Sequence, residues 1–250
     1  SAPLDRAARA IVMLFMLTGA INISLHWAAL SGRPGAYGRD PEVGFLAFLV
    51  ITATALVTIA LVSTGAGSVP AALFDVISAV TTTGYAGALD GPRPGMVAVI
   101  LAGLALIGGG IGSTAGGIKL ARGLLLIRQS RRELQRAPHP RGGVRVRIGS
   151  ASVADAAMQG IWAFFVLFVG CLILATIALA AAGLDMVAAL THALSALTNT
   201  GPLLAEATGT AMALSGLPAP VLLMMTGLMV VGRLEVIAVL VLLSRGFWQR

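Results

Sequence analysis

The stretch Ser78-Ala79-Val80-Thr81-Thr82-Thr83-Gly84 decides the fold, because the chain contains the same frame a second time as Ser195-Ala196-Leu197-Thr198-Asn199-Thr200-Gly201, 117 positions later. Each copy ends an apolar run that is too short to cross a bilayer, and each lies between two runs that are long enough. A frame that returns at a fixed offset indicates an internal repeat. We interpret each copy as a re-entrant pore loop whose Thr-x-Gly backbone lines an ion path.

The composition is that of an integral membrane protein. Of the 250 residues, 57% are hydrophobic and 11% are charged, whereas about a quarter of a soluble domain is charged. The net charge of +7 could indicate nucleic-acid binding, but nine of the 17 basic residues fall between Lys119 and Arg147. No aromatic residue interrupts that cluster, so a nucleic-acid partner is disfavoured. A basic cluster beside apolar spans is typical of a cytoplasmic loop.

Apolar periodicity predicts five spans with two short helices between them. The spans are expected at about 11–30, 43–62, 96–128 with a break, 156–182 and 218–243. The short helices are expected at 70–80 and 186–197, and a helix of that length rises only about half of a bilayer core. Each short helix must therefore enter the membrane and turn back, with a linker over 201–215 after the second one.

Charge distribution predicts the orientation. The loops expected inside hold Arg33 and Arg39, the basic cluster, and Arg245 with Arg250. Those expected outside hold Asp90, Arg93, Asp185 and Glu206, with Asp90 and Arg93 on an exposed turn. The N-terminus is then outside and the C-terminus cytoplasmic. Because the chain starts at Ser1, without Met and just before a span, we expect further sequence upstream.

The repeated frame suits cation conduction. Backbone carbonyls of a Thr-x-Gly turn can replace the hydration shell of a cation when several copies face one axis. The short helix before each turn directs its negative end toward the same place. Asp75 is expected near the start of the first short helix, where it could also attract cations at the mouth. The alternative is that both copies are ordinary turns between helices.

The segment from Gly108 to Gly117 has six glycines among its ten residues, so it cannot hold a stable helix. Three interpretations stay open: a phosphate cradle, a helix-packing surface of small residues, or a flexible plug beneath the filter. The repeat offset supports the plug, because it aligns Arg233 with Gly116. An ionisable residue inside a span usually marks a pathway, so Arg233 is expected to act as a brake on the permeating cation or, alternatively, to form an ion pair.

Other polar residues carry weaker signals. Asn22, His26 and His192 are expected to be satisfied polar groups between helices. Cys171 is expected to be a small buried hydrophobe. Ser113 and Ser195 have no His or Asp arranged to activate them, so the sequence does not predict an enzyme.

These motifs resemble the membrane subunit of Trk/Ktr/HKT-type potassium transporters. The resemblance rests on the span, short-helix, Thr-Thr-Gly, span order, on the glycine segment that ends in Ile118-Lys119, and on Gly232-Arg233-Leu234-Glu235. Two further motifs also look like that family. They are His26 with Arg39-Asp40-Pro41-Glu42, and Arg132-Glu133-Leu134 with His139-Pro140.

The resemblance implies four potassium-channel-like units around one pore, of which this chain would hold the C-terminal half. It implies K⁺ coordination at Thr82, Thr83, Gly84, Asn199, Thr200 and Gly201, with the ion itself at Thr82, Thr83, Asn199 and Thr200. It implies a gating loop of Gly108, Gly109, Gly110, Gly112, Ser113, Thr114, Gly116 and Gly117, and a pore charge at Arg233. It also implies a homodimer and a cytoplasmic nucleotide-binding regulatory subunit, for which the basic loop is a contact.

The sequence therefore predicts an all-α polytopic membrane protein of the bacterial inner membrane, with repeated span–pore-loop–span units. The expected divisions are the last helix of an upstream unit (1–30), a third pore unit (43–130), a basic cytoplasmic loop (131–153) and a fourth pore unit (154–250). The expected function is potassium uptake through a gated pore, with K⁺ as the transported ion and no covalently bound cofactor. The alternative is a secondary transporter, but that requires inverted repeats, and the two units here run in the same direction.

Overall fold

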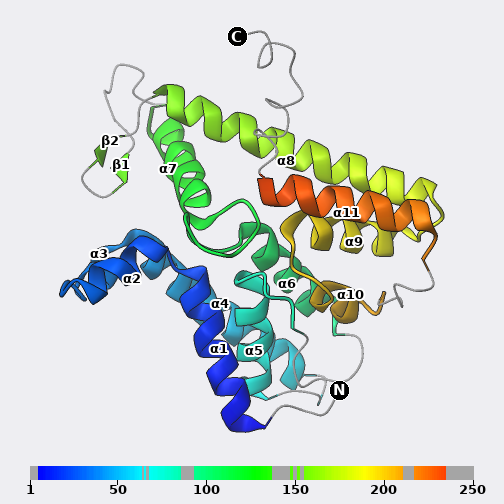
Figure 1. Ribbon diagram of the computed structural model, residues 1–250, viewed down its shortest axis with the longest axis horizontal. Coiled ribbons are helices and arrows are strands. Elements are labelled where there is room, and N and C mark those ends of the chain that lie inside the picture. Colours follow the sequence, from blue (N-terminus) through cyan, green and yellow to red (C-terminus); the bar gives the residue numbers. More distant parts are fainter. Residues whose placement is uncertain are drawn as a thin grey trace.

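In the computed structural model of the protein, the chain is a bundle of helices of very different lengths (Figure 1). The structure describes residues 5–63, 65, 68–85, 93–136, 147–148, 151–152, 155–210 and 217–234. The helices are α1 (Arg6–Ala20), α2 (Ile23–Leu30), α3 (Ala36–Arg39), α4 (Pro41–Val62), α5 (Val69–Val80), α6 (Gly95–Ile107), α7 (Leu120–Arg136), α8 (Asp155–Ala181), α9 (Met186–Thr198), α10 (Leu203–Thr208) and α11 (Ala219–Leu234). The predictions made for Asp90, Glu235, Arg245, Arg250 and His139-Pro140 lie outside the described residues.

The all-α prediction is confirmed. Within the described ranges, the sole departure is a hairpin of β1 (Arg147–Ile148) and β2 (Ala151–Ser152), which pair antiparallel. Within the part of the chain that the structure describes, two helices, α4 and α8, are long and apolar enough to cross a membrane singly. They match the predicted spans 43–62 and 156–182. The third predicted span is broken as expected, because α6 ends at Ile107 and α7 begins at Leu120.

The first predicted span, 11–30, is wrong as a single straight helix. The axes of α1 and α2 differ by 100° across a break at Ile21 and Asn22. Asn22 caps α2, because its side-chain oxygen accepts a hydrogen bond from the Ser24 N–H at 2.9 Å. The carbonyl of Ala20 accepts the N–H of Gly110 at 2.9 Å, so a distant loop satisfies the end of α1. Tertiary contacts thus impose the bend.

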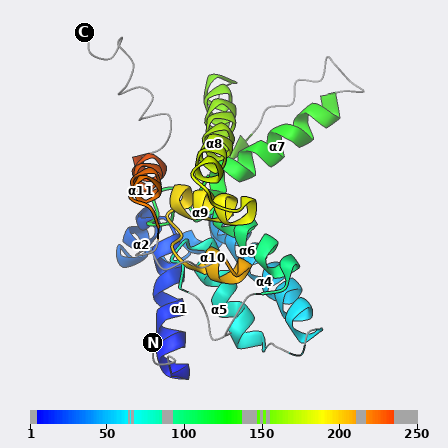
Figure 2. The same cartoon turned by 90° about the vertical axis from the view of Figure 1, so that its right-hand side faces the viewer.

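Two further boundaries differ from the sequence prediction. The linker 201–215 contains a helix, α10, which packs against α5, α6 and α9. The basic loop was expected to begin at 131, but α7 continues to Arg136. In Figure 2 this amphipathic helix projects away from the rest of the bundle.

The short helices lie inside the fold and the long helices lie around them. Nine of the 12 residues of α5 and ten of the 13 residues of α9 are buried, against five of the 22 residues of α4. The helices α4, α5 and α6 share one apolar cluster, and α8, α9 and α11 share another. Side chains such as Phe15, Val99 and Leu174 are exposed, as expected for surfaces that face lipid.

Packing around α5 gives a direct test of this arrangement. Leu101 on α6 is fully buried in the cluster that surrounds α5, whereas Val99 on the same helix is 73% exposed. We expect Leu101→Ala to leave a cavity and to lower the free energy of unfolding by about 2 kcal/mol or more, and Val99→Ala to leave it nearly unchanged. Thermal unfolding of the detergent-purified variants measures the difference. Equal losses in both variants would contradict the placement of α6.

Candidate ion pathway

The loop that follows α5 folds back onto the last turn of that helix. Thr82 and Gly84 have left-handed backbone, with φ of 51° and 77°. The N–H groups of Thr83 and Gly84 both donate to the carbonyl of Ser78, at 3.0 and 3.3 Å. A glycine adopts this backbone at little cost, which explains why the frame ends in Gly.

The loop that follows α9 has the same geometry. Asn199 and Gly201 have φ of 55° and 79°, and the Thr200 N–H donates to the carbonyl of Ser195 at 3.0 Å. Asn is one of the few non-glycine residues that tolerate left-handed backbone. The repeated sequence frame therefore corresponds to a repeated loop conformation.

Hydroxyl groups brace both loops from within. The hydroxyls of Thr81 and Thr83 are 2.8 Å apart, and those of Thr198 and Thr200 are 2.6 Å apart. In the same way, the Ser78 hydroxyl donates to the Tyr85 carbonyl at 2.8 Å, and the Ser195 hydroxyl donates to the Gly201 carbonyl. These side chains are occupied by one another and by the main chain.

The main-chain oxygens of the six predicted filter residues fall into two groups. The Gly84 carbonyl accepts the N–H of Leu203 at 3.1 Å, and the Gly201 carbonyl accepts the Ser195 hydroxyl. The carbonyls of the other four accept no hydrogen bond from the described part of the chain: Thr82, Thr83, Asn199 and Thr200. Unpaired main-chain oxygens at two helix ends are suitable ligands for a cation.

The two loops touch. A Cβ placed on Gly84 would overlap the carbonyl oxygen of Thr200, so the approach requires glycine on one side. The bond from Leu203 to Gly84 ties the beginning of α10 to the same place. The structure thus brings all six predicted filter residues into one neighbourhood.

The glycine segment is a closed loop beside both filter loops. The N–H groups of Ile118 and Lys119 donate to the carbonyls of Leu106 and Ile107, each at 2.9 Å, so the segment leaves the helix and returns to it. The segment is not helical, so the close packing of its glycines is that of a loop against helix ends, such as the end of α9 at Gly116, rather than of one helix against another. Gly116 lies near the carboxyl end of the segment and contacts both filter loops: its N–H donates to the Thr82 hydroxyl at 2.7 Å, and a Cβ on Gly116 would overlap the Thr198 carbonyl.

Other elements hold the glycine segment from the opposite side. The Ile111 N–H donates to a carboxylate oxygen of Glu42 at 2.8 Å. The N–H and the hydroxyl of Thr114 both donate to the Gly19 carbonyl, at 3.0 and 2.9 Å. Arg233 Nη1 donates to the Thr114 carbonyl at 2.8 Å. Arg233, which the repeat offset aligns with Gly116, therefore contacts this segment at Thr114.

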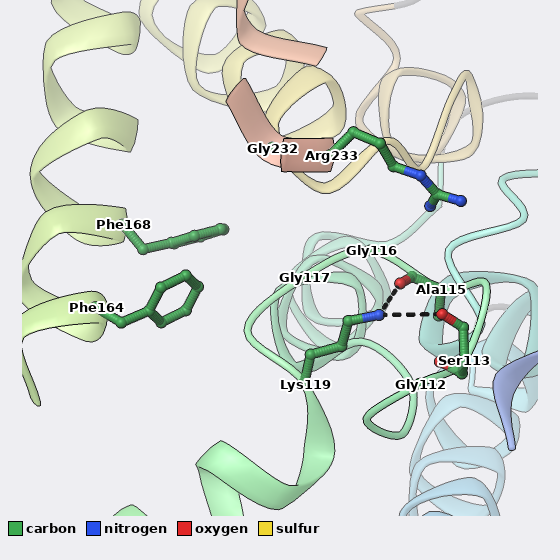
Figure 3. Close-up of a pocket in the computed structure, with 10 residues that line it drawn as sticks. All are labelled: Gly112, Ser113, Ala115, Gly116, Gly117, Lys119, Phe164, Phe168, Gly232 and Arg233. Carbon is green, nitrogen blue, oxygen red and sulfur yellow. Dashed lines mark hydrogen bonds between the residues drawn. The ribbon is translucent and has the colours of Figure 1, made fainter. Parts of the chain in front are cut away.

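A cavity of about 300 Å³ opens between the glycine segment, α8 and α11 (Figure 3). Its wall contains two cationic side chains, Lys119 and Arg233, and two rings of α8, Phe164 and Phe168. Lys119 Nζ donates to the Ser113 carbonyl at 3.4 Å and also to the Ala115 carbonyl. Sequence reasoning missed Lys119 as a site residue, although its place directly after the glycines could have drawn notice.

Two predictions about charged residues are wrong. Asp75 is not at the start of its helix or at an open mouth; it lies in the middle of α5 and is fully buried. Arg93, expected on an exposed turn, is 7% exposed and pairs with Asp75 at 3.3 Å. Burial of one charge requires the other nearby.

The weaker polar signals are satisfied groups, as predicted. His26 has its two ring nitrogens 2.6 Å from the Tyr37 hydroxyl and 2.8 Å from the Thr18 carbonyl. His192 Nε2 is 3.3 Å from the Thr210 carbonyl. Cys171, expected to be a buried hydrophobe, is only half-buried and lies beside α11.

Comparisons with known proteins agree with this geometry. The family model of the cation transport protein TrkH matches residues 43–249. The Trk system potassium uptake protein TrkH of Halomonas elongata is 34% identical over 250 residues, covering 98% of this chain and 51% of the relative. The protein of the same name from Escherichia coli is 32% identical over 247 residues, covering 96% and 50%.

A solved structure is also similar. The crystal structure of the potassium transporter TrkH from Vibrio parahaemolyticus matches with a TM-score of 0.87 and 29% sequence identity, covering 98% of this chain and 53% of that one. The chain spans about half the length of the curated relatives that it matches. Because the family model covers most of the sequence, this membrane protein belongs to the TrkH family of cation transport proteins.

Proposed function

We propose that the chain forms two of the four filter segments of a potassium-uptake pore. The observation that carries the proposal is the pair of matching loops after α5 and α9, which meet at Gly84 and Thr200. In the proposal, K⁺ is coordinated by the carbonyls of Thr82, Thr83, Asn199 and Thr200. The Gly84 and Gly201 positions complete the filter by allowing the backbone to turn.

The physical chemistry of both loops favours a cation. Carbonyl dipoles can replace the hydration shell of K⁺ when they are held at fixed positions, and the hydroxyl pairs Thr81–Thr83 and Thr198–Thr200 supply that support. The carboxyl-terminal ends of α5 and α9 add partial negative charge. Because both helices are buried, water screens this charge weakly.

In this proposal the glycine segment is the gate. The segment contacts both filter loops through Gly116, and Arg233 donates a hydrogen bond to its Thr114 carbonyl. Lys119 and Arg233 place two positive charges beside the path, which opposes the passage of a cation. Movement of the segment away from Thr82 would open the path. The hydrogen bonds that the segment donates to Glu42 and to the Gly19 carbonyl would guide that movement.

The names of the relatives support potassium as the transported ion and uptake as the direction. We assign 43–130 and 154–250 to the third and fourth pore units, 1–30 to the end of an upstream unit and 131–153 to a basic cytoplasmic loop. We further infer that the protein works in the bacterial inner membrane as a homodimer, with a cytoplasmic nucleotide-binding regulatory subunit near the basic end of α7. Transport of this kind moves K⁺ along its electrochemical gradient and requires no catalysis by the chain.

The contact between the loops yields a test of the filter. Gly84→Ala introduces a Cβ that collides with the Thr200 carbonyl and also strains the left-handed backbone. We expect rubidium uptake, measured in potassium-uptake-deficient cells that express the complete gene, to fall by roughly tenfold or more. Gly201→Asp is expected to abolish uptake by placing a carboxylate beside the ligands. Normal uptake in both variants, at normal membrane levels, would remove the filter assignment.

The gate has a separate test. Arg233→Ala removes both a positive charge beside the path and the bond to the Thr114 carbonyl. We expect the maximal rate of rubidium uptake to rise by a few fold, as expected when about 1 kcal/mol of a barrier is removed. Arg233→Lys keeps the charge and serves as the control. A lower rate with normal insertion would indicate that Arg233 stabilises the open path instead.

A further inference from the structure

Each of the two short helices, α5 and α9, carries a buried polar side chain that contacts the stretch of chain following the filter loop. On α5, Asp75 Oδ2 lies 3.3 Å from both Nε and Nη2 of Arg93. On α9, His192 Nε2 lies 3.3 Å from the carbonyl oxygen of Thr210. Both members of the second pair come 117 positions after their counterparts in the first. The same contact thus occurs twice, as an ion pair in one unit and as a hydrogen bond between a side chain and the main chain in the other.

Arg93 also contacts the second unit, through its main chain. The Arg93 main-chain N–H donates to the Ala207 carbonyl of α10 at 2.9 Å. At its other end, α10 is bonded to the first filter loop, because the Leu203 N–H donates to the Gly84 carbonyl. Arg93 and Gly84 therefore hold the two ends of a helix that directly follows the second filter loop.

Asp75 is connected to the first filter loop through Ser78 of the same helix, α5. Ser78 follows Asp75 by three residues and so lies on the same side of the helix. Its hydroxyl donates to the Tyr85 carbonyl, and its own carbonyl accepts the N–H groups of Thr83 and Gly84. A closed chain of contacts results: α5, the first filter loop, α10, Arg93 and back to Asp75.

The ion pair requires a reason other than stability. A buried ion pair is often no more stabilising than apolar residues of the same size, but its hydrogen bonds fix geometry more narrowly. Both charged side chains are nearly inaccessible, at 0% and 2% exposure for Asp75 and Arg93. Here the ion pair can fix the distance between the two filter loops, whose carbonyl oxygens must fit around one ion.

We propose that Asp75 and Arg93 are positioning residues that set the separation of the two filter loops and thereby the preference among cations. This inference rests on the proposed function of the loops as a potassium filter. Arg93 acts through α10 on the second loop and through Asp75 and α5 on the first. The contact of His192 with the Thr210 carbonyl holds the corresponding segment of the second unit in place.

The experiment compares Asp75→Asn, Arg93→Lys and the exchanged pair Asp75→Arg/Arg93→Asp, each expressed from the complete gene in potassium-uptake-deficient cells. KM and maximal rate for rubidium, the ratio of rubidium to sodium uptake, and the amount of protein in the membrane are measured. Asp185→Asn is the matched control, because Asp185 is an exposed acid that caps α9 and does not contact Asp75 or Arg93.

We expect Asp75→Asn and Arg93→Lys to raise KM for rubidium by roughly tenfold and to lower the rubidium-to-sodium ratio, at membrane levels near those of the unaltered protein. The exchanged pair should recover part of both values, and Asp185→Asn should change neither. If Asp75→Asn does not insert, Asp75→Glu, which keeps the charge but changes the reach, provides the same comparison.

Two results would overturn the inference. One is an unchanged KM and an unchanged ion ratio in all the single variants of the pair. The other is a fall in maximal rate that follows the loss of protein from the membrane while KM and the ratio stay constant, since that describes a purely structural pair. Absence of rubidium uptake by the unaltered protein would contradict the proposed function itself, and with it the inference.

Discussion

A helix that stops inside a membrane leaves main-chain groups without partners, and the rest of this fold depends on how two such ends are satisfied. Lipid offers no hydrogen bonds, so each unpaired group must be met by protein, water or an ion. After α5 and α9, the hydroxyls of Ser78 and Ser195 meet part of this demand by donating to main-chain carbonyls of the loops. Among the six predicted filter residues, the carbonyls of four accept no hydrogen bond from the described ranges, and these are the oxygens that we propose as ligands of the ion.

Glycine allows the main chain to pack closely around these ends. Three glycines from separate elements each lie against a carbonyl at the end of α9 or in its loop. Gly232 of α11 meets the Leu197 carbonyl, Gly116 meets that of Thr198, and Gly84 meets that of Thr200. A side chain at any of the three would force the elements apart. The same closeness makes the glycine segment sensitive to movements of the filter loops, which suits a gate placed next to them.

Much of this architecture could be predicted from sequence, because its signals are local. The apolar lengths of α4 and α8, the shortness of α5 and α9, and the glycine break after Ile107 are properties of single stretches of chain. The repeat at a fixed offset also aligned Arg233 with Gly116 of the glycine segment, and Arg233 contacts that segment at Thr114. The ion-binding roles of the filter residues remain predictions.

The features that sequence reasoning missed depend on contacts between distant segments. The bend between α1 and α2 follows from bonds to Gly110 and Thr114, about 90 residues away. Asp75 and Arg93 look like surface charges near turns, and only the return of the chain along α5 buries them together. Helix α10 is short and is held by Gly84 and Arg93 rather than by its own propensity.

The most direct test of the account is a crystal structure of the complete protein in rubidium, with the ion located by its anomalous scattering. The account predicts rubidium density within coordination distance of the main-chain oxygens of Thr82, Thr83, Asn199 and Thr200. Rubidium bound elsewhere in the membrane region, with those four oxygens turned toward lipid or packed side chains, would contradict it.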